Sequence, residues 1–282
     1  MQAAPRQLSD LFEGLRLTPV QRRIAAHIVG QGTRAAFISS VELAERVGVS
    51  QPSVTRLATA LGYNGFGELQ QAIQTVVIER HAPGPAQAPE QNKMQRAVQH
   101  AIDGLQRLQL ELVDLSTVER AAGALAESPV LLVYGSRTAA PLARQFEFFA
   151  SKIHPNVRLL SGSRSELLDQ LSHARELGAS AMLAIALPRY PQELMELLRA
   201  AERSGLSVVL VTDTPLCAAA EFATAVLPAP VSSDLVFDSG VAPMLLLTVL
   251  LEALADATPS RSRERLERFE TLATEQRYFV GK

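Results

Sequence analysis

The sequence predicts an all-α helix-turn-helix domain followed by an α/β doubly wound domain with a five-stranded parallel sheet. Before residue 81 the apolar residues recur only at helical spacing, whereas from about residue 130 short apolar runs alternate with amphipathic stretches. Between these regions the segment 81–91 (HAPGPAQAPEQ) holds three prolines and no hydrophobic periodicity, as in an extended linker. We therefore predict domains at residues 1–80 and 92–282, joined by a linker at 81–91.

The composition is compatible with two domains, each with its own hydrophobic core, of which the N-terminal one binds DNA. Of the 282 residues 47% are hydrophobic, and the formal net charge is −2. Residues 1–81 nevertheless carry 8 arginines against 6 acidic residues, a small basic excess. No segment approaches the ~20 uninterrupted apolar residues of a membrane span, and the N-terminus lacks a signal-peptide pattern, so we expect a cytoplasmic protein. Cys217 is the only cysteine, so we predict no disulfide, metal site or cofactor.

The strongest local pattern is residues 40–57, SVELAERVGVSQPSVTRL. A helix-turn-helix needs a small residue where its helices cross, here Ala44, and a turn residue that accepts positive φ, here Gly48. Ser39 with Glu42 would cap the first helix, and Ser50 would start the second. The apolar positions that both helices would share as a core are Leu43, Val47, Val49, Val54 and Leu57.

The second helix would turn its polar residues outward, where a recognition helix meets the major groove. Glutamine can pair with adenine, and arginine with guanine. The residues predicted to contact DNA are Ser50, Gln51, Ser53, Thr55 and Arg56, with Arg22, Arg23 and Arg34 as candidates for phosphate contacts. The alternative is an ordinary helical hairpin with a solvated polar face.

Five apolar runs are predicted as strands, at 130–134, 157–160, 181–186, 207–211 and 225–227. Helical stretches between them, such as 142–152, 166–177 and 193–204, would cross over the sheet. This alternation predicts a parallel sheet with helices on both faces and a ligand site at the carboxyl ends of the strands. Further helices are predicted at 94–113, 117–127, 241–255 and 261–278.

Residues 17–73 resemble the RpiR-type helix-turn-helix domain. Its closing signature, LG-(Y/F)-x-G-(F/Y)-x-E-L, is present as Leu61, Gly62, Tyr63, Gly65, Phe66, Glu68 and Leu69. The C-terminal part looks like the SIS (sugar isomerase) domain that those regulators carry. The resemblance implies a bacterial transcription regulator, a homodimer or homotetramer that binds double-stranded, palindromic DNA under the control of a small metabolite.

SIS domains typically hold a phosphosugar at two loops, one resembling G-x-G-x-S and one resembling S-x-S-G-x-T-x-E. In this sequence Arg137 and Arg189 stand at glycine positions of these loops, and four hydroxyl positions are taken by Ala139, Ala186, Pro188 and Pro191. We therefore expect an anion, either a phosphosugar or another carboxylate, sulfonate or phosphate compound. The candidate ligand-binding residues are Gly135, Ser136, Arg137, Thr138, Ser161, Ser163, Arg189 and Tyr190. Asp213 is either a pocket residue or, as we prefer, a helix cap.

Two alternatives stay open. The arginines could form ion pairs in a degenerate pocket, so that the SIS-like domain only dimerises; the helix 241–254 is the candidate for packing between subunits, and burial in its own domain is the simpler alternative. The other is a sugar-phosphate isomerase, which needs a general base. None of the five histidines lies in the two loops, and Glu193, the one carboxylate there, is more simply explained by its place at a helix start. We therefore predict no catalytic residue.

Overall fold

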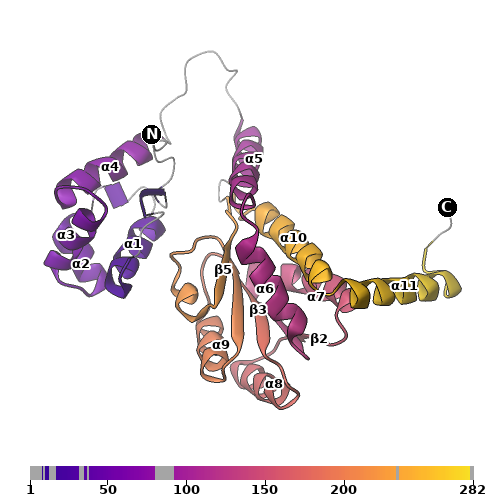
Figure 1. Ribbon diagram of the computed structural model, residues 1–282. Coiled ribbons are helices and arrows are strands. Elements are labelled where there is room, and N and C mark those ends of the chain that lie inside the picture. The colour runs from indigo at the N-terminus through magenta and orange to yellow at the C-terminus, as the bar shows by residue number, and fades with distance from the viewer. Residues whose placement is uncertain are drawn as a thin grey trace. The chain divides into compact units, whose positions relative to one another are not determined.

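The computed structural model describes residues 8, 10–12, 17–31, 35–36, 38–79, 92–232 and 235–279 (Figure 1). Their contacts divide them into two compact units, one formed mainly by residues before 91 and one that contains the sheet. The predicted linker 81–91 and Arg34 lie outside the described residues. The domain boundaries therefore stay predictions.

The N-terminal unit is built from helices alone in its described part. They are the short 3-10 turn η1 (Asp10–Phe12), α1 (Pro19–Gln31), α2 (Ser40–Val47), α3 (Gln51–Ala60) and α4 (Phe66–Glu79). Ile24 of α1, Leu43 of α2 and Leu57 of α3 are buried in one cluster. Three helices thus share a core, as the apolar spacing predicts.

The C-terminal unit contains a parallel sheet in the order β2-β1-β3-β4-β5 (Figure 1). Its strands are β1 (Leu131–Gly135), β2 (Val157–Leu160), β3 (Ala181–Ala186), β4 (Ser207–Thr212) and β5 (Ala225–Pro228). All six residues of the central strand β3 are buried, because helices cover both faces. The predicted fold class and all five strands are confirmed, to within one residue at each end.

Helices cover the sheet in two layers. The described helices of this unit are α5 (Lys93–Glu111), α6 (Ser116–Glu127), α7 (Ala140–Ile153), α8 (Arg164–Glu176), α9 (Gln192–Arg203), α10 (Val241–Ala257) and α11 (Pro259–Glu275), with 3-10 turns η3 (Arg137–Ala139) and η4 (Ala218–Phe222). Helices α6, α7 and α10 pack together against one face, and α8 and α9 against the other. In the part of the chain that the structure describes, no single helix has the length and composition of a membrane span.

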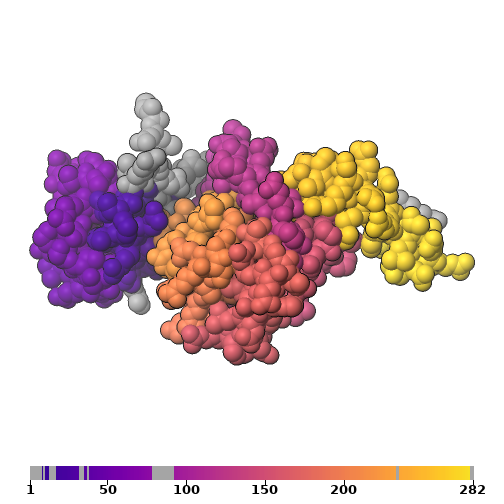
Figure 2. All heavy atoms as spheres, turned by 60° about the horizontal axis from the view of Figure 1, so that its bottom comes forward, coloured from indigo at the N-terminus to yellow at the C-terminus, as the bar shows by residue number. Residues whose placement is uncertain are grey.

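The last two helices differ in how many of their side chains are buried. Helix α10 places Leu246, Leu250 and Leu254 in the core of its own unit, which is the simpler of the two interpretations of this apolar helix. Helix α11 leaves α10 at a bend of 109° and projects from the body of the unit (Figures 1 and 2). The Arg261 and Arg265 guanidinium groups tie it back by donating to the carbonyl oxygens of Ala126 (2.8 Å) and Ser151 (2.7 Å).

Candidate DNA-binding surface and effector site

The turn between α2 and α3 has the geometry of a helix-turn-helix. Ser39 caps α2, because its Oγ accepts the Glu42 N–H at 3.2 Å. Gly48 ends α2 in the left-handed conformation, with φ 70°, and its N–H donates to the Glu45 carbonyl at 3.2 Å. Ala44, the small residue at the helix crossing, is 4% exposed. The structure therefore places these residues as the motif requires.

The outer face of α3 presents the predicted base-contacting residues to solvent. Gln51, Thr55 and Arg56 are exposed and Ser53 is half-buried. The Gln51 amide donates to the Ser40 Oγ at 3.1 Å, and the Arg56 guanidinium donates to the Ser53 Oγ at 2.9 Å. Both side chains keep further donors that could reach a base edge. Ser50 precedes α3, and its hydroxyl lies 2.9 Å from that of Ser53.

Arg22 and Arg23 differ in their surroundings, although sequence reasoning treats them alike. The Arg23 guanidinium donates to the Val47 carbonyl at 2.6 Å, so it ties α1 to the carboxyl end of α2. Arg22 is exposed. Arg22 is therefore the better candidate for a contact with phosphate alone, while Arg23 also holds the motif together.

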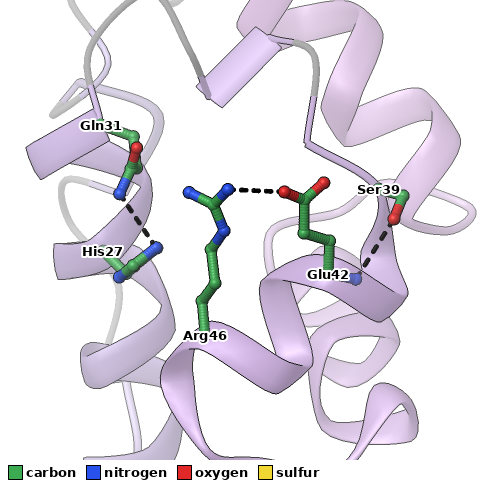
Figure 3. A network of polar contacts seen from close by, with 5 residues as sticks. All are labelled: His27, Gln31, Ser39, Glu42 and Arg46. Atoms are coloured by element: carbon green, nitrogen blue, oxygen red, sulfur yellow. Dashed lines mark hydrogen bonds and ion pairs between the residues drawn. The ribbon is translucent and has the colours of Figure 1, made fainter.

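Polar side chains of α1 and α2 face one another (Figure 3). Arg46 forms an ion pair with Glu42 at 2.6 Å, and its guanidinium lies between Glu42 and His27. The His27 Nε2 lies 3.2 Å from the amide nitrogen of Gln31. Partial burial, followed by the charge of Arg46, lowers the pKa of His27, which therefore stays neutral near pH 7. The hydrogen bond from Arg23 to the Val47 carbonyl and the apolar side chains that α1 and α2 bury in one cluster hold the two helices together.

In the second unit, the loops predicted to bind the ligand follow β1 and β3, the neighbouring strands between which the strand order changes direction. The chain passes from β1 to β2 on one side of β1, and then back to β3 on its other side. Loops at the carboxyl ends of β1 and β3 therefore diverge and leave a crevice, which is where open parallel sheets bind ligands.

Two arginines lie in this crevice with unusual backbones. Arg137, after β1, has φ 53°, and Arg189, after β3, has φ 69°. Both line one small hollow, together with Ser136, Thr138 and Pro188, with a volume of about 10 Å³, roughly the room that one water molecule needs. The left-handed conformation costs a non-glycine residue roughly 1–2 kcal/mol and persists only where the surroundings impose it. Within the described ranges neither guanidinium forms an ion pair, contrary to the degenerate-pocket alternative.

The helices that follow β1 and β3 begin without side-chain caps. Their cap residues are Ala139, before α7, and Pro191, before α9, whose side chains accept no hydrogen bond. A Cβ on Gly135 would lie 2.7 Å from the Ala139 carbonyl oxygen, so the first loop needs glycine for space. The start of α9 leaves backbone N–H groups beside the arginine hollow, where an anion is favoured. At the start of α7 the N–H groups of Ala139 and Ala140 instead donate to the carbonyls of Ser136 and Arg137, and Pro141 has no N–H.

The loop after β2 is different, and it gives two predicted ligand residues other partners. Ser163 caps α8 in a capping box, its own N–H donating to the Glu166 carboxylate at 2.6 Å. The backbone of Ser161 is bonded to the Gln170 side chain, with the amide donating to the Ser161 carbonyl at 2.7 Å. The structure thus groups Ser136, Arg137, Thr138 and Arg189 in one hollow. Its lining does not include the other four predicted residues, Gly135, Ser161, Ser163 and Tyr190.

Tyr190 and Asp213 form a pair that sequence reasoning missed. The Tyr190 hydroxyl donates to the Asp213 carboxylate, and so does Thr212, at 3.3 Å. Burial raises the pKa of Asp213. No described helix begins at Asp213, so the preferred interpretation as a helix cap is wrong. The pair fastens the loop that carries Arg189 to the end of β4; the signal for it was that β3 and β4 are neighbouring parallel strands.

Comparison with known proteins identifies the first unit. Residues 12–77 match the family model described as "Helix-turn-helix domain, rpiR family". The N-terminal unit is an rpiR-family helix-turn-helix domain. The chain is 23% identical, over 83% of its length and 83% of the relative, to the "Uncharacterized HTH-type transcriptional regulator in aarA 3'region" of Providencia stuartii. It is a transcriptional regulator in which this domain precedes a SIS-like domain.

Two solved structures share its fold. The Vibrio vulnificus NanR protein, solved in complex with ManNAc-6P, is 17% identical, with a TM-score of 0.56 over 95% of this chain and 98% of that one. The sugar isomerase domain of an RpiR transcription factor from Sphaerobacter thermophilus is 21% identical, with a TM-score of 0.55 over 62% of this chain and 97% of that one. These likenesses establish that the sheet-containing unit has the SIS fold.

Proposed function

We propose that this regulator binds a specific double-stranded DNA sequence through α3, and that a small anion bound between Arg137 and Arg189 changes its affinity for that DNA. The proposed effector site rests on one observation. Arg137 and Arg189 both have a left-handed backbone and line the same hollow, at the point where the strand order reverses. Strained residues cluster at ligand sites. Arg277, after α11, has the same backbone, with φ 52°, so it is the shared hollow that distinguishes Arg137 and Arg189. The NanR structure with ManNAc-6P supports a ligand-binding role for the SIS fold of this regulator.

The chemistry of the hollow suits an anion. A guanidinium can bind a carboxylate, sulfonate or phosphate through two parallel hydrogen bonds, and two of them line the hollow. The amino-terminal end of α9 adds N–H groups and the positive end of a helix dipole. A bound anion would therefore neutralise the guanidinium charges of Arg137 and Arg189, which form no ion pair within the described residues.

The DNA-binding part implies an assembly of at least two copies. One recognition helix reads too few base pairs for genomic specificity, and a two-fold protein matches a palindromic site. We propose a homodimer or homotetramer with paired α3 helices. An effector that favours one arrangement of the assembly by ~1–3 kcal/mol would change DNA affinity about 5- to 150-fold.

Selection from random duplexes tests the DNA-binding part. We expect an enriched palindromic motif; Gln51→Ala or Arg56→Ala should relax it at one or two base pairs and cost about 1–3 kcal/mol there. Arg22→Ala should weaken all sequences equally and reduce the salt dependence. No enriched motif from the wild-type protein would refute specific binding by α3.

Removing one guanidinium tests the effector part. Asparagine tolerates the left-handed backbone, so Arg189→Asn and Arg137→Asn remove charge with little change in strain. We expect both variants to keep ligand-free DNA binding and to lose the thermal stabilisation that inorganic phosphate and short carboxylates give the wild type. Arg203→Asn, at the far end of α9, is the control. If no anion stabilises the wild type, the SIS-like domain serves assembly alone.

A further inference from the structure

The arginine hollow adjoins a second hollow of different chemistry. Thr138, Leu187 and Pro188 line both, so the two share a wall. The second hollow has a volume of about 130 Å³, which is smaller than a site for a drug-sized ligand and leaves room for only a short chain of a few carbons. Its other lining residues come from α7 and from the chain just before α10, namely Pro141, Leu142, Val231, Asp238 and Gly240.

Most of this second hollow is apolar. Proline, leucine and valine side chains form its walls, and of its lining residues Thr138 and Asp238 carry the polar side-chain groups. A sugar placed there would face these walls with several hydroxyls, each of which costs free energy when it leaves water without a partner. A hydrocarbon chain would instead gain about 0.8 kcal/mol for each buried methylene. The second hollow therefore discriminates against polyhydroxylated ligands.

We propose that the effector is an organic acid with an apolar chain of a few carbons, its acid group between Arg137 and Arg189 and its chain in the second hollow. This rests on the proposed anion site and adds the ligand's class. The ligand can bind in only one orientation, because the arginines line only the first hollow and Asp238 lines only the second. The Asp238 carboxylate lies beyond the shared wall, where it would repel a second acid group. The site therefore favours monoacids over diacids of equal length.

A chain-length series tests the proposal on the full-length protein. We would titrate it with acetate, butyrate and hexanoate, and with inorganic phosphate and glucose 6-phosphate, by calorimetry at constant ionic strength. Affinity should rise about fourfold per methylene, or about 250-fold from acetate to hexanoate. Glucose 6-phosphate should bind no more tightly than inorganic phosphate.

A variant that fills the second hollow tests whether the chain of the ligand binds there. Gly240 has φ −92°, open to any residue, and a Cβ there would lie 3.8 Å from the Leu142 Cδ1, an ordinary contact. Gly240→Leu should therefore fold, bind acetate and phosphate as the wild type does, and lose the gain from acetate to hexanoate. Gly123→Leu, on α6, where nothing lies within 4 Å of a Cβ, is the matched control and should keep the gain.

The charge of Asp238 gives a second, independent readout. Adipate has the length of hexanoate with an acid at each end, and it should bind at least tenfold more weakly than hexanoate. Asp238→Asn should remove most of this difference while leaving hexanoate affinity within about twofold. A merely structural role of Asp238 would change both ligands alike.

The outcomes separate this inference from the function on which it rests. If acetate and phosphate bind through Arg189 but affinity does not rise with chain length, the apolar-chain ligand is wrong and the anion site stands. Tighter binding of glucose 6-phosphate than of phosphate would likewise overturn it in favour of a phosphosugar. If none of the anions binds, both proposals fail.

Discussion

The helix-turn-helix turn and the two effector loops adopt the same local backbone with different residues. Gly48 ends α2 at φ 70°, and Arg137 and Arg189 follow strands at φ 53° and 69°. In the turn, glycine takes this conformation without steric cost, and nothing in the motif requires a side chain there. In the loops, a large charged side chain is present despite a cost of roughly 1–2 kcal/mol each.

This difference distinguishes a position kept for shape from one kept for chemistry. The turn needs the chain to reverse between α2 and α3, and any side chain at Gly48 would only add strain. In the function that we propose, the loops use guanidinium groups to bind an anion, and the rest of the unit offsets the strain there.

The largest effect is expected at Gly135, a loop glycine that is needed for space. Its Cβ would lie 2.7 Å from the Ala139 carbonyl oxygen and 2.9 Å from the Ala143 Cβ. Gly135→Ala must push α7 away from β1, so we expect a loss of about 2–3 kcal/mol in the stability of the sheet-containing unit. Hydrogen exchange of β1 and β3 peptides measures this unit separately.

The control for Gly135 is Gly123→Ala, in the middle of α6, where a new Cβ meets nothing within 4 Å. Alanine is the better helix former, so this variant should gain up to about 1 kcal/mol. A loss as large as that of Gly135→Ala would mean that any added methyl group destabilises the unit, and the argument from close approach would be wrong.

The next effect concerns the pair that fastens the Arg189 loop. Tyr190→Phe removes the hydroxyl that donates to Asp213 and should cost about 1–2 kcal/mol, seen as faster hydrogen exchange in residues 187–194. Tyr278→Phe, at an exposed tyrosine beyond α11, is the control and should change nothing. Equal exchange in the wild type and Tyr190→Phe would show that the loop is held by other contacts.

Asp213 also gives this loop a pH dependence. Because burial raises its pKa in the folded protein, the folded state holds this proton to higher pH than the unfolded chain does. The contribution of Asp213 to stability is therefore highest below its ordinary pKa of 3.8 and falls as the pH rises through the raised value. Asp213→Asn keeps an acceptor for Tyr190 and should remove this slope. Unchanged pH dependence of melting in the variant would contradict the assignment.

Much of this architecture could be predicted from the sequence, since it depends on local spacing. Strands buried on both faces appear as uninterrupted apolar runs, so β3 is found at its predicted residues. Arg137 and Arg189 could be expected to meet, because neighbouring parallel strands end at the same edge. The second hollow could not be predicted, because Leu142 and Val231 are far apart in the chain and come together only when α7 packs beside the segment before α10. Tyr190 and Asp213 were each singled out, but the hydrogen bond between them was missed, because it joins loops that follow two different strands.

A smaller effect is expected in the helix-turn-helix turn. A Cβ on Gly48 would have room, its nearest neighbour being a guanidinium nitrogen of Arg23 at 3.8 Å, so only the backbone opposes a side chain. Gly48→Ala should cost about 1 kcal/mol of the N-terminal unit's stability and weaken DNA binding. Gly30→Ala, in α1 with an ordinary backbone and open space, should be neutral or stabilising. If both variants behaved alike, positive φ would not be what keeps glycine at position 48.

The smallest effect is expected at Arg189, where two substitutions separate the backbone strain of the residue from its charge. Arg189→Gly and Arg189→Ala both remove the guanidinium, but only glycine also relieves the left-handed strain. Glycine's larger conformational freedom in the unfolded chain offsets part of that relief, so Arg189→Gly should be more stable than the wild type by about 0–1 kcal/mol. Arg189→Ala keeps the strain and should be about 1 kcal/mol less stable than Arg189→Gly. Neither should bind phosphate or acetate. Hydrogen exchange across residues 187–194 and calorimetry measure the two properties in the same samples. A glycine variant less stable than the alanine variant would show that this loop holds Arg189 without strain.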